Sequence, residues 1–346
     1  MKGIILHGGH GTRLRPLTHT GPKQLLPIAN KPMSQYCIES LREAGITDIG
    51  IIIGGLGSNK VREYYGNGEK FGVNLTYFEQ DFPRGIAHAI RLCKEFVNNE
   101  KFLVFLGDNI IQKPIVNFVE NFNKSDYDAT VLLCEVDNPS RFGIADVENA
   151  KIVKITEKPK EPTSNLAVTG IYLLTPLIFE VIDNLKPSWR NELEITDALD
   201  NLLKQNDNIG YETITDYWKD TGTPEDILNA NRQVLEHICG TADAIFESKI
   251  HDKVSLDLTY RRPCIIGKNC EIDGSASIGP NVSIGDDTMI SSGVVIENSI
   301  IMSGCKIDGG LNIKDSIISA NCHLHGNNKD KTKKIFLLGE GTKISL

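Results

Sequence analysis

The sequence predicts an α/β domain with a mostly parallel sheet flanked by helices, followed by a parallel β-helix. Three observations support this fold class. Apolar runs alternate with helical patterns up to about residue 235, apolar residues then recur every six positions, and 346 residues are enough for two separate cores. We expect a first domain at 1–238, a connector at 239–260 and the β-helix at 261–346.

The first domain begins with an apolar run, Gly3 to Leu6, that predicts a buried strand. Further strands are predicted at 49–54, 75–79, 102–106 and 130–136. Helical spacing between these runs predicts helices at 33–44, 59–65 and 85–97. Such alternation is typical of a Rossmann-like sheet with helices on both faces, where ligands bind outside the carboxyl ends of the strands.

A glycine-rich loop, residues 8–11, follows the first strand at this predicted ligand edge. Glycines let the backbone turn sharply and approach a ligand closely. Arg13, Arg15 and Lys23 bring three cations into the same segment, which suits the binding of a triphosphate. A plain strand-to-helix turn is the alternative. Neither the dinucleotide-binding fingerprint nor the Gly-Lys-Ser/Thr of a P-loop is present.

Two other strand ends carry charged residues. Asp108 follows the apolar run LVFL, where a carboxylate can hold Mg²⁺ against phosphate oxygens, although an Asp-Asn turn is the alternative. Glu157 and Lys158 end another predicted strand, and the compact charge of a lysine can bind a phosphate. An exposed Glu-Lys turn before Pro159 is the alternative explanation for this second pair.

The C-terminal region carries the six-residue repeat. Its members are Ile266, Ile272, Ile278, Ile284, Ile290, Ile296 and Met302. The repeat shifts by one at Ile307 and resumes at Ile313. A repeat this short predicts a parallel β-helix with the apolar residue pointing inward. We expect an exposed turn at 326–334 and closing strands at 335–338 and 343–346.

Composition excludes several classes of protein. The net charge of −8 argues against nucleic-acid binding, because a polyanion needs a basic surface. No apolar stretch reaches the roughly 18 residues of a membrane span, and residues 1–6 show no signal-peptide pattern, so we expect a cytoplasmic protein. The eight cysteines form no C-x-x-C pair, which favours reduced, buried thiols over disulfides or zinc.

The string GGHGTRLRPLT…PKQ resembles the signature G-G-x-G-T-R-L-x-P-x-T…P-K-Q of sugar-1-phosphate nucleotidyltransferases. The segments ITEKP, AVTGIY and YWKDTG resemble further motifs of that family, and the hexapeptide repeat resembles the left-handed β-helix of the long glucose-1-phosphate thymidylyltransferases. The resemblance implies transfer of a nucleotidyl group from dTTP or UTP to glucose 1-phosphate. The products would be dTDP-glucose or UDP-glucose and pyrophosphate, with Mg²⁺ assisting in-line attack.

The same resemblance implies roles for individual residues. It assigns catalysis to Arg13, Lys23, Asp108 and Lys158, and Mg²⁺ binding to Asp108 and Asp220. The implied nucleotide-binding residues are Leu6, Gly8, Gly9, Gly11, Thr12, Arg13, Lys23, Gln24, Gln80 and Gly85. The implied sugar-phosphate residues are Gly143, Glu157, Lys158, Val168, Thr169, Gly170 and Trp218, with Phe142 beside the sugar. Gln24 favours a pyrimidine, because its amide offers a donor and an acceptor to thymine or uracil.

Two features depart from the family pattern. His7 stands where the family has a small residue, and His10 occupies a variable loop position; His7 either alters the site or is a tolerated wall. His323 and His325 could serve a hexapeptide acyltransferase, but a surface coil or oligomer contact is the stronger alternative. A non-catalytic nucleotide-sugar-binding regulatory subunit and a bifunctional acetyltransferase remain alternatives. We expect a homo-oligomer in which the β-helix contributes the interface.

Overall fold

The structure, a computed structural model, describes the chain except residues 10, 56, 207, 241–244, 247–258 and 328–331. The chain packs as two compact units. The first comprises Met1–Gly9 with Ser34–Asp220, and the second comprises His10–Met33 with Thr221–Leu346. Most of the predicted connector at 239–260 lies outside the described residues, so the predicted bounds of the two domains and their connector stay a prediction.

The first unit is built on a nine-stranded sheet. Its strands are β1 (Lys2–Leu6), β4 (Asp48–Ile53), β5 (Asn74–Glu79), β6 (Phe102–Leu106), β8 (Ala129–Glu135), β9 (Gly143–Glu148), β10 (Lys151–Glu157), β11 (Leu166–Leu174) and β12 (Ile209–Thr213). The order is β10-β9-β11-β6-β1-β4-β5, and β8 pairs with β11 and β12. The predicted α/β fold class is confirmed. In detail the sheet is mixed: β6, β1, β4 and β5 are parallel, whereas β11 is antiparallel to β6, β8 and β9.

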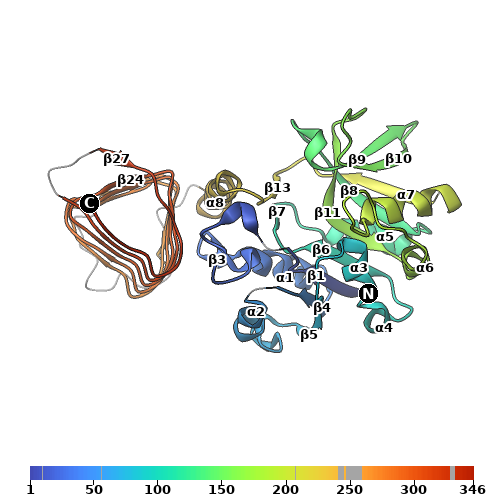
Figure 1. Cartoon of the computed structure of the whole chain (residues 1–346), viewed down its shortest axis with the longest axis horizontal. Helices are drawn as coiled ribbons and strands as arrows, with labels where there is room; N and C mark the ends of the chain where they lie inside the picture. The colour runs from blue at the N-terminus through green and yellow to red at the C-terminus, as the bar shows by residue number, and fades with distance from the viewer. Residues whose placement is uncertain (10, 56, 207, 241–244, 247–258, 328–331) are drawn as a thin grey trace. The chain divides into compact units, whose positions relative to one another are not determined.

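Helices flank this sheet (Figure 1). They are α1 (Met33–Glu43), α2 (Ser58–Tyr65), α3 (Ile86–Arg91), α4 (Lys94–Val97), α5 (Val116–Lys124), α6 (Leu177–Asp183) and α7 (Ile195–Asn206), with short 3₁₀ turns η3 (Glu69–Phe71) and η4 (Pro139–Arg141). The prediction of a single helix at 85–97 is wrong. This segment forms two helices, α3 and α4, because Leu92 N and Cys93 N donate to carbonyls three residues back and tighten the backbone there.

The core of the first unit lies between the sheet and α3, α6 and α7. Ile90 of α3 and Ile182 of α6 are almost fully buried against Ile4 of β1. The ring of Phe102 in β6 stacks on that of Phe179 in α6, with centroids 5.4 Å apart. This packing holds the parallel strands in one register, so it also determines which strand ends meet at the ligand edge.

The carboxyl ends of the central strands are aligned. Leu6 of β1 lies opposite Ile52 of β4 and Leu106 of β6. The next residues continue the alignment, since Gly107 N donates to Leu6 O at 3.0 Å. Gly8 and Asp108 therefore follow neighbouring strands at the same edge, where a parallel sheet binds ligands.

The second unit contains three sheets of short parallel strands. One consists of β14 (Ile245–Phe246), β16 (Cys264–Ile266), β19 (Val282–Ile284), β22 (Ile300–Ile301), β25 (Ile317–Ile318) and β28 (Leu337–Leu338). Another consists of β15 (Thr259–Tyr260), β18 (Ser277–Ile278), β21 (Val295–Glu297), β24 (Asn312–Lys314) and β27 (Lys333–Lys334). The last consists of β17 (Glu271–Ile272), β20 (Met289–Ile290), β23 (Lys306–Asp308), β26 (His323–His325) and β29 (Lys343–Ser345). Figure 1 shows them stacked as successive coils, consistent with the predicted left-handed β-helix.

The register of the repeat differs from the prediction at one step. Ile284 pairs with Ile301, not with the predicted Met302, so the five-residue step comes before Ile301 and six-residue steps follow to Ile307 and Ile313. Both neighbours are apolar, which is why spacing alone chose the wrong one. Ile301 is fully buried in the coil interior, and Met302 retains 8% exposure.

The C-terminal end of the β-helix closes largely as predicted. Strands β28 and β29 lie within the two predicted closing segments. Part of the exposed turn predicted at 326–334, residues 328–331, lies outside the described residues, and Lys333–Lys334 form a strand. Among the two histidines noted in the sequence, His323 contacts a carboxylate oxygen of Asp308 at 3.0 Å. This contact is consistent with the alternative that His323 is a residue of a surface coil.

Helix α8 (Pro224–Cys239) and the hairpin of β2 (Pro27–Ile28) and β3 (Lys31–Pro32) complete the second unit, together with η1 (Thr12–Leu14) and η2 (Lys23–Leu25). Asn231 of α8 is buried, and its Oδ1 accepts hydrogen bonds from Ala29 N at 2.9 Å and Ser283 Oγ at 2.6 Å. Asn30 Nδ2 donates to Ile284 O at 2.7 Å. These contacts join Ala29 and Asn30 to α8 and to the β-helix within the second unit.

All eight cysteines are free, and seven of them are buried, as predicted. Burial raises the pKa of the Cys93 thiol, which keeps it protonated and unreactive. Among the described helices, none is both long and apolar enough to cross a membrane.

Candidate active site

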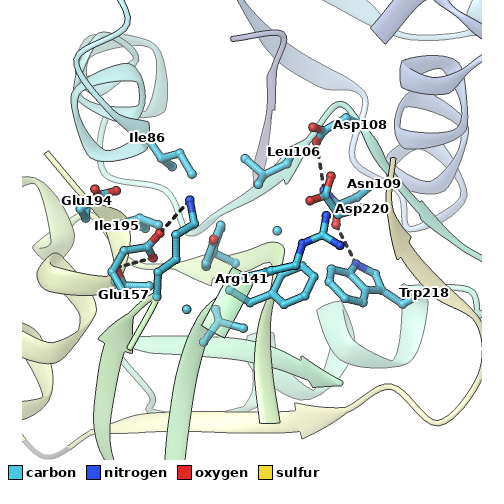
Figure 2. A pocket seen from close by; sticks show the side chains of 17 residues that line it. Ile86, Leu106, Asp108, Asn109, Arg141, Glu157, Glu194, Ile195, Trp218 and Asp220 are labelled. Atoms are coloured by element: carbon cyan, nitrogen blue, oxygen red, sulfur yellow. Dashed lines mark hydrogen bonds and ion pairs between the residues drawn. The ribbon is translucent and has the colours of Figure 1, made fainter. Parts of the chain in front are cut away.

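Two carboxylates meet at the ligand edge through a small two-stranded sheet. Asp108 directly precedes β7 (Asn109–Ile111), which pairs antiparallel with β13 (Trp218–Asp220) so that Asn109 lies opposite Asp220. The Asn109 side chain links the two strands. Its Nδ2 donates to Asp108 Oδ1 at 3.1 Å, and its Oδ1 accepts from Trp218 Nε1 at 2.7 Å (Figure 2). Asn109 is buried, so these bonds hold the Asp108 carboxylate in one orientation.

The donor set at this edge fits a magnesium ion. Asp108 and Asp220 both line the same pocket, and in the part of the chain that the structure describes no three acidic, histidine or cysteine side chains form a metal cluster. Mg²⁺ commonly takes only one or two carboxylates and completes its octahedron with phosphate oxygens and water. Two carboxylates beside a pocket therefore suit an ion that arrives with a phosphate ligand.

The pocket encloses a cavity of about 140 Å³, smaller than the roughly 300–1,000 Å³ typical of small-ligand sites. Its lining residues are Ile86, Leu106, Asp108, Asn109, Arg141, Phe142, Gly143, Glu157, Lys158, Val168, Gly170, Tyr172, Glu194, Ile195, Thr196, Trp218 and Asp220. Figure 2 shows Asp108 and Asp220 on one side and Glu157 and Glu194 on the other. Nine of the sequence-predicted site residues, counting Phe142, are thus brought together, including both predicted metal ligands and the predicted sugar-phosphate pair.

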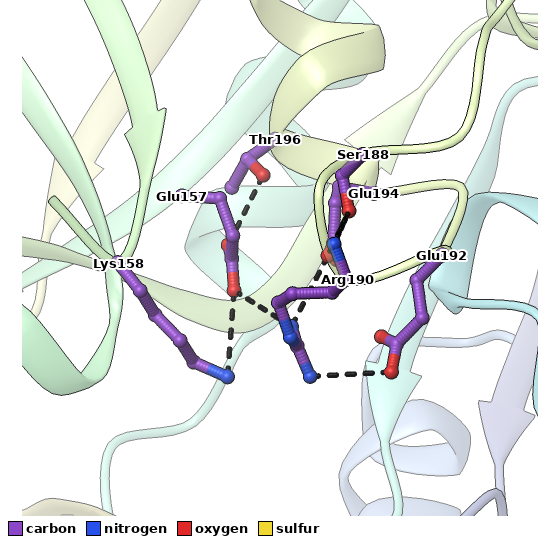
Figure 3. A network of polar contacts seen from close by, with 7 residues as sticks. All are labelled: Glu157, Lys158, Ser188, Arg190, Glu192, Glu194 and Thr196. Carbon is purple, nitrogen blue, oxygen red and sulfur yellow. Dashed lines mark hydrogen bonds and ion pairs between the residues drawn. The ribbon is translucent and has the colours of Figure 1, made fainter.

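Glu157 and Lys158 lie at the end of β10. Glu157 Oε2 accepts a hydrogen bond from Thr196 Oγ1 at 3.1 Å, and its Oε1 lies 3.4 Å from Arg190 Nη1 and 3.6 Å from Lys158 Nζ (Figure 3). Burial raises the pKa of the Glu157 carboxyl, and Glu194 acts in the same direction, while Lys158, Thr196 and Arg190 oppose them. The carboxylate is therefore oriented by its neighbours and sensitive to the loss of any one of them.

A second acid, Glu194, reinforces this side of the pocket. Glu194 precedes α7 and is 4% exposed, and its Oε1 accepts from Arg190 Nη1 and from Ser188 Oγ, both at 3.1 Å. Arg190 also pairs with Glu192 at 3.2 Å. Sequence patterns did not single out Arg190, Glu194 and Thr196, although the charged residues at 190–194, directly before α7, were a visible signal.

The aromatic side of the pocket is formed by Phe142 and Trp218. Their rings pack edge to face with centroids 5.7 Å apart. The adjacent Gly143 is required there, because a Cβ atom would lie 2.5 Å from Thr196 Cγ2 and 3.3 Å from Glu157 Oε2. A side chain at this position would fill the space in front of the Glu157 carboxylate. Arg141, another lining residue, also went unnoticed in the sequence.

Strand β11 contributes alternate residues to the pocket. Val168, Gly170 and Tyr172 line it, as the two-residue period of a strand requires. Thr169 faces the opposite side of the sheet, is fully buried, and donates its Oγ1 to Leu132 O at 2.8 Å. Thr169 is thus the one member of the predicted trio that the structure does not bring to the pocket.

The predicted nucleotide residues of the first unit lie along the strand ends. Gly8 lies two residues after Leu6, the last residue of β1, and a Cβ on Gly8 would be 3.9 Å from Gln80 Oε1. His7, whose role the sequence left open, is 1% exposed and packs edge to face on Tyr65. Burial lowers the pKa of His7 to about 3, outweighing the nearby Asp108 carboxylate, so the ring is neutral. A neutral, buried imidazole agrees with the interpretation of His7 as a wall of the site.

The remaining predicted nucleotide residues belong to the second unit. Gly11 has a positive φ of 57°, and its carbonyl accepts a hydrogen bond from Thr18 Oγ1 at 2.8 Å. The guanidinium of Arg13 packs against Gly222, where a Cβ would lie 3.2 Å from Nη2. Lys23 and the buried Gln24 begin η2. The predicted roles of these residues, and that of Thr12, stay predictions. His10 lies outside the described residues.

Comparison with known proteins identifies relatives over the whole chain. Residues 2–237 match the family described as nucleotidyl transferase, and residues 260–345 match the GMPPB C-terminal domain. A glucose-1-phosphate thymidylyltransferase of Streptomyces antibioticus is 39% identical over 100% of this chain and 99% of its own length. The low-salt glycan biosynthesis nucleotidyltransferase of Haloferax volcanii is 50% identical over 68% of this chain but only 66% of its own.

A solved structure agrees with these relatives. A crystal structure assigned to a glucose-1-phosphate thymidylyltransferase of Bacillus anthracis, in complex with sucrose, superposes with a TM-score of 0.65 at 46% identity. The match covers 67% of this chain and 94% of that one.

Proposed function

This chain belongs to the nucleotidyl transferase family and is a nucleotidyltransferase, and we propose that it transfers a nucleotidyl group from dTTP or UTP to glucose 1-phosphate. The products are dTDP-glucose or UDP-glucose and pyrophosphate. One observation carries the proposal: a single pocket holds the Asp108–Asp220 pair and the Glu157–Lys158 pair. A site with carboxylates for a metal ion and a lysine for a phosphate suits the joining of two phosphorylated substrates. Full-length alignment with the Streptomyces antibioticus enzyme supports the choice of substrates.

The reaction needs no covalent intermediate on the protein. A phosphate oxygen of the sugar attacks the α-phosphorus of the nucleotide in line, and pyrophosphate leaves. Catalysis then consists of holding two anions together and stabilising the charge that develops on the leaving group. We assign the sugar phosphate to Lys158 and the sugar hydroxyls to Glu157. We assign the β- and γ-phosphates to Arg13 and the transferring phosphoryl region to Lys23.

Asp108 and Asp220 are the residues that would hold Mg²⁺. When bound, the ion neutralises phosphate charge and helps to align the reacting groups. Asn109 and Trp218 support this role because their hydrogen bonds keep the Asp108 carboxylate oriented. On the nucleotide side we assign base recognition to Gln24 and Gln80, whose amides offer both a donor and an acceptor to thymine or uracil.

The test is release of pyrophosphate from glucose 1-phosphate and Mg²⁺ with dTTP, UTP, GTP, ATP and CTP in parallel. Release with dTTP or UTP alone is the expected result. Tight binding of dTTP without any release would contradict the proposal and would favour the non-catalytic, nucleotide-sugar-binding alternative. Release with the purines at equal rate would contradict the pyrimidine assignment.

We also propose a cytoplasmic location and a homo-oligomer with an interface that includes the β-helix. Light scattering after gel filtration tests the second proposal. A monomer at all concentrations used in the assay would refute it.

A further inference from the structure

The side chain of Gln80 is held at a fixed place beside Gly8 of the glycine-rich loop. Gln80 follows β5, and its backbone N donates to Ile53 O at 2.8 Å. The residue is 8% exposed, so its carboxamide is almost completely removed from solvent. A polar group buried to this extent needs hydrogen-bond partners, and those partners determine which way the amide faces.

The segment after Gln80 is anchored to the start of α7. Leu193 N donates to Arg84 O at 2.7 Å, and Ala87 N donates to Leu193 O at 3.0 Å. Gly85 lies between these two bonds with a φ of +101°, and a Cβ there would lie 2.4 Å from Leu193 O. Only glycine fits this close approach of two backbones. The carbonyl of Gly85 is therefore a fixed acceptor for the Gln80 amide.

The chemistry of the partners fixes the orientation of the Gln80 amide. Gln80 Nε2 lies 3.3 Å from Gly85 O, and a carbonyl oxygen can only accept, so the NH₂ group must be on that side. The same Nε2 lies 2.9 Å from His88 Nδ1. Nδ1 must then be the unprotonated acceptor nitrogen of a neutral ring, with the proton on Nε2. Both hydrogens of the Gln80 amide are thereby used.

Gln80 Oε1 is left on the side of Gly8. It lies 3.9 Å from the Cβ position of Gly8, and among the residues that the structure describes no hydrogen bond to it is seen. A carbonyl oxygen presented in this way can accept from an N–H group of a ligand. Such an acceptor distinguishes the pyrimidine bases from one another, because N3 carries a proton in thymine and uracil but is itself an acceptor in cytosine.

We propose that His88 is a positioning residue for base selection: by accepting from Gln80 Nε2, it turns Gln80 Oε1 toward the base and favours pyrimidines with a proton on N3. This inference rests on the proposed function for its ligand class, since Gln80 faces a base only if the chain binds a nucleotide. It assigns a function to a histidine that sequence patterns did not single out. Without His88 the amide keeps only the Gly85 carbonyl as a partner, so its orientation is held less strongly and Nε2 can face the base more readily, which suits cytosine.

The charges around His88 favour the neutral ring that this arrangement needs. Burial lowers the pKa of His88, and the neighbouring Arg84 and Arg91 lower it further, against a smaller opposing effect of Asp81. Arg91 itself pairs with Asp183 of α6 at 2.8 Å. The ring is thus available as an acceptor at neutral pH.

The test compares His88→Leu with His88→Asn, because an asparagine Oδ1 can take the place of the imidazole Nδ1 as acceptor. Equilibrium binding of UTP and of CTP is measured by calorimetry for wild type and both variants, and unfolding temperatures are recorded. We expect wild type to prefer UTP. His88→Leu should lower the UTP-to-CTP affinity ratio about fivefold, the effect of one lost hydrogen bond, and His88→Asn should recover most of it.

An unchanged ratio in a folded His88→Leu variant would overturn the inference, and so would a wild type that does not distinguish UTP from CTP. Because binding is measured without turnover, the outcome is independent of the proposed reaction. A ratio that falls as expected in a protein that releases no pyrophosphate would support the role of His88 and refute the proposed function.

Discussion

Replacing Thr196 by valine removes one hydrogen bond from the Glu157 carboxylate and keeps the shape of the side chain. Thr196 Oγ1 donates to Glu157 Oε2 at 3.1 Å, in a place where the Glu157 side chain is only 16% exposed. A hydrogen bond to a charged group contributes about 1.5–3 kcal/mol, and about 1.4 kcal/mol corresponds to a tenfold change. We therefore expect kcat/KM for glucose 1-phosphate to fall at least tenfold at neutral pH.

The pH dependence follows from the same bond. Donation from Thr196 stabilises the ionised carboxylate, so it lowers the pKa of Glu157 against the larger effect of burial, which raises it. Without that donor the pKa rises further. The acid limb of the kcat/KM profile should accordingly move to higher pH, and the loss of activity should be greater near pH 5.5 than near pH 8.

The assay is pyrophosphate release at saturating nucleotide, with glucose 1-phosphate varied from pH 5 to 8. Thr196→Ser is the matched control, because it keeps the hydroxyl and removes only the methyl group; its acid limb should coincide with that of wild type. The KM for nucleotide should be unchanged in both variants. If a folded Thr196→Val variant gives the wild-type profile, then Glu157 does not act through its ionised form and our reasoning about this side of the pocket is wrong.

Three further predictions follow from the structure. Asp108→Asn and Arg13→Ala should each reduce turnover by about two orders of magnitude or more, and EDTA should abolish turnover until Mg²⁺ is restored; near-normal rates in both variants would contradict the assignments. Ile284→Ala, at a fully buried position of the β-helix, should lower the free energy of unfolding by about 2–5 kcal/mol in urea titrations, whereas Met289→Ala, 43% exposed, should change it little. Burial lowers the pKa of His7 to about 3, so its ring signals in NMR should not titrate between pH 5.5 and 8, and a midpoint near 6.5 would show that the ring is exposed.

Much of the fold could be predicted because its determinants are local. The strand at 102–106 agrees with β6 residue for residue, since a run of five apolar residues ending at Gly107 identifies a buried strand without further context. Asp108 was predicted from the same run, because an acid after a buried parallel strand must lie at the ligand edge. The six-residue repeat likewise predicted the parallel β-helix. Within the repeat only the choice between Ile301 and Met302 failed, because both are apolar and spacing cannot separate them.

The sequence by itself thus determined the α/β class, the β-helix and the charged strand ends, because periodicity and strand-end chemistry act over a few residues. Only the tertiary structure decided which partners those residues contact. The pairing of β7 with β13 brings Asp220 opposite Asn109, and the fold of the 188–194 segment brings Arg190 to Glu157. Strand pleating turns Thr169 away from the pocket although its neighbours line it. These outcomes depend on contacts between segments that are far apart in the sequence. Their physical origin is the register in which the strands pack, and a local sequence pattern does not contain that information.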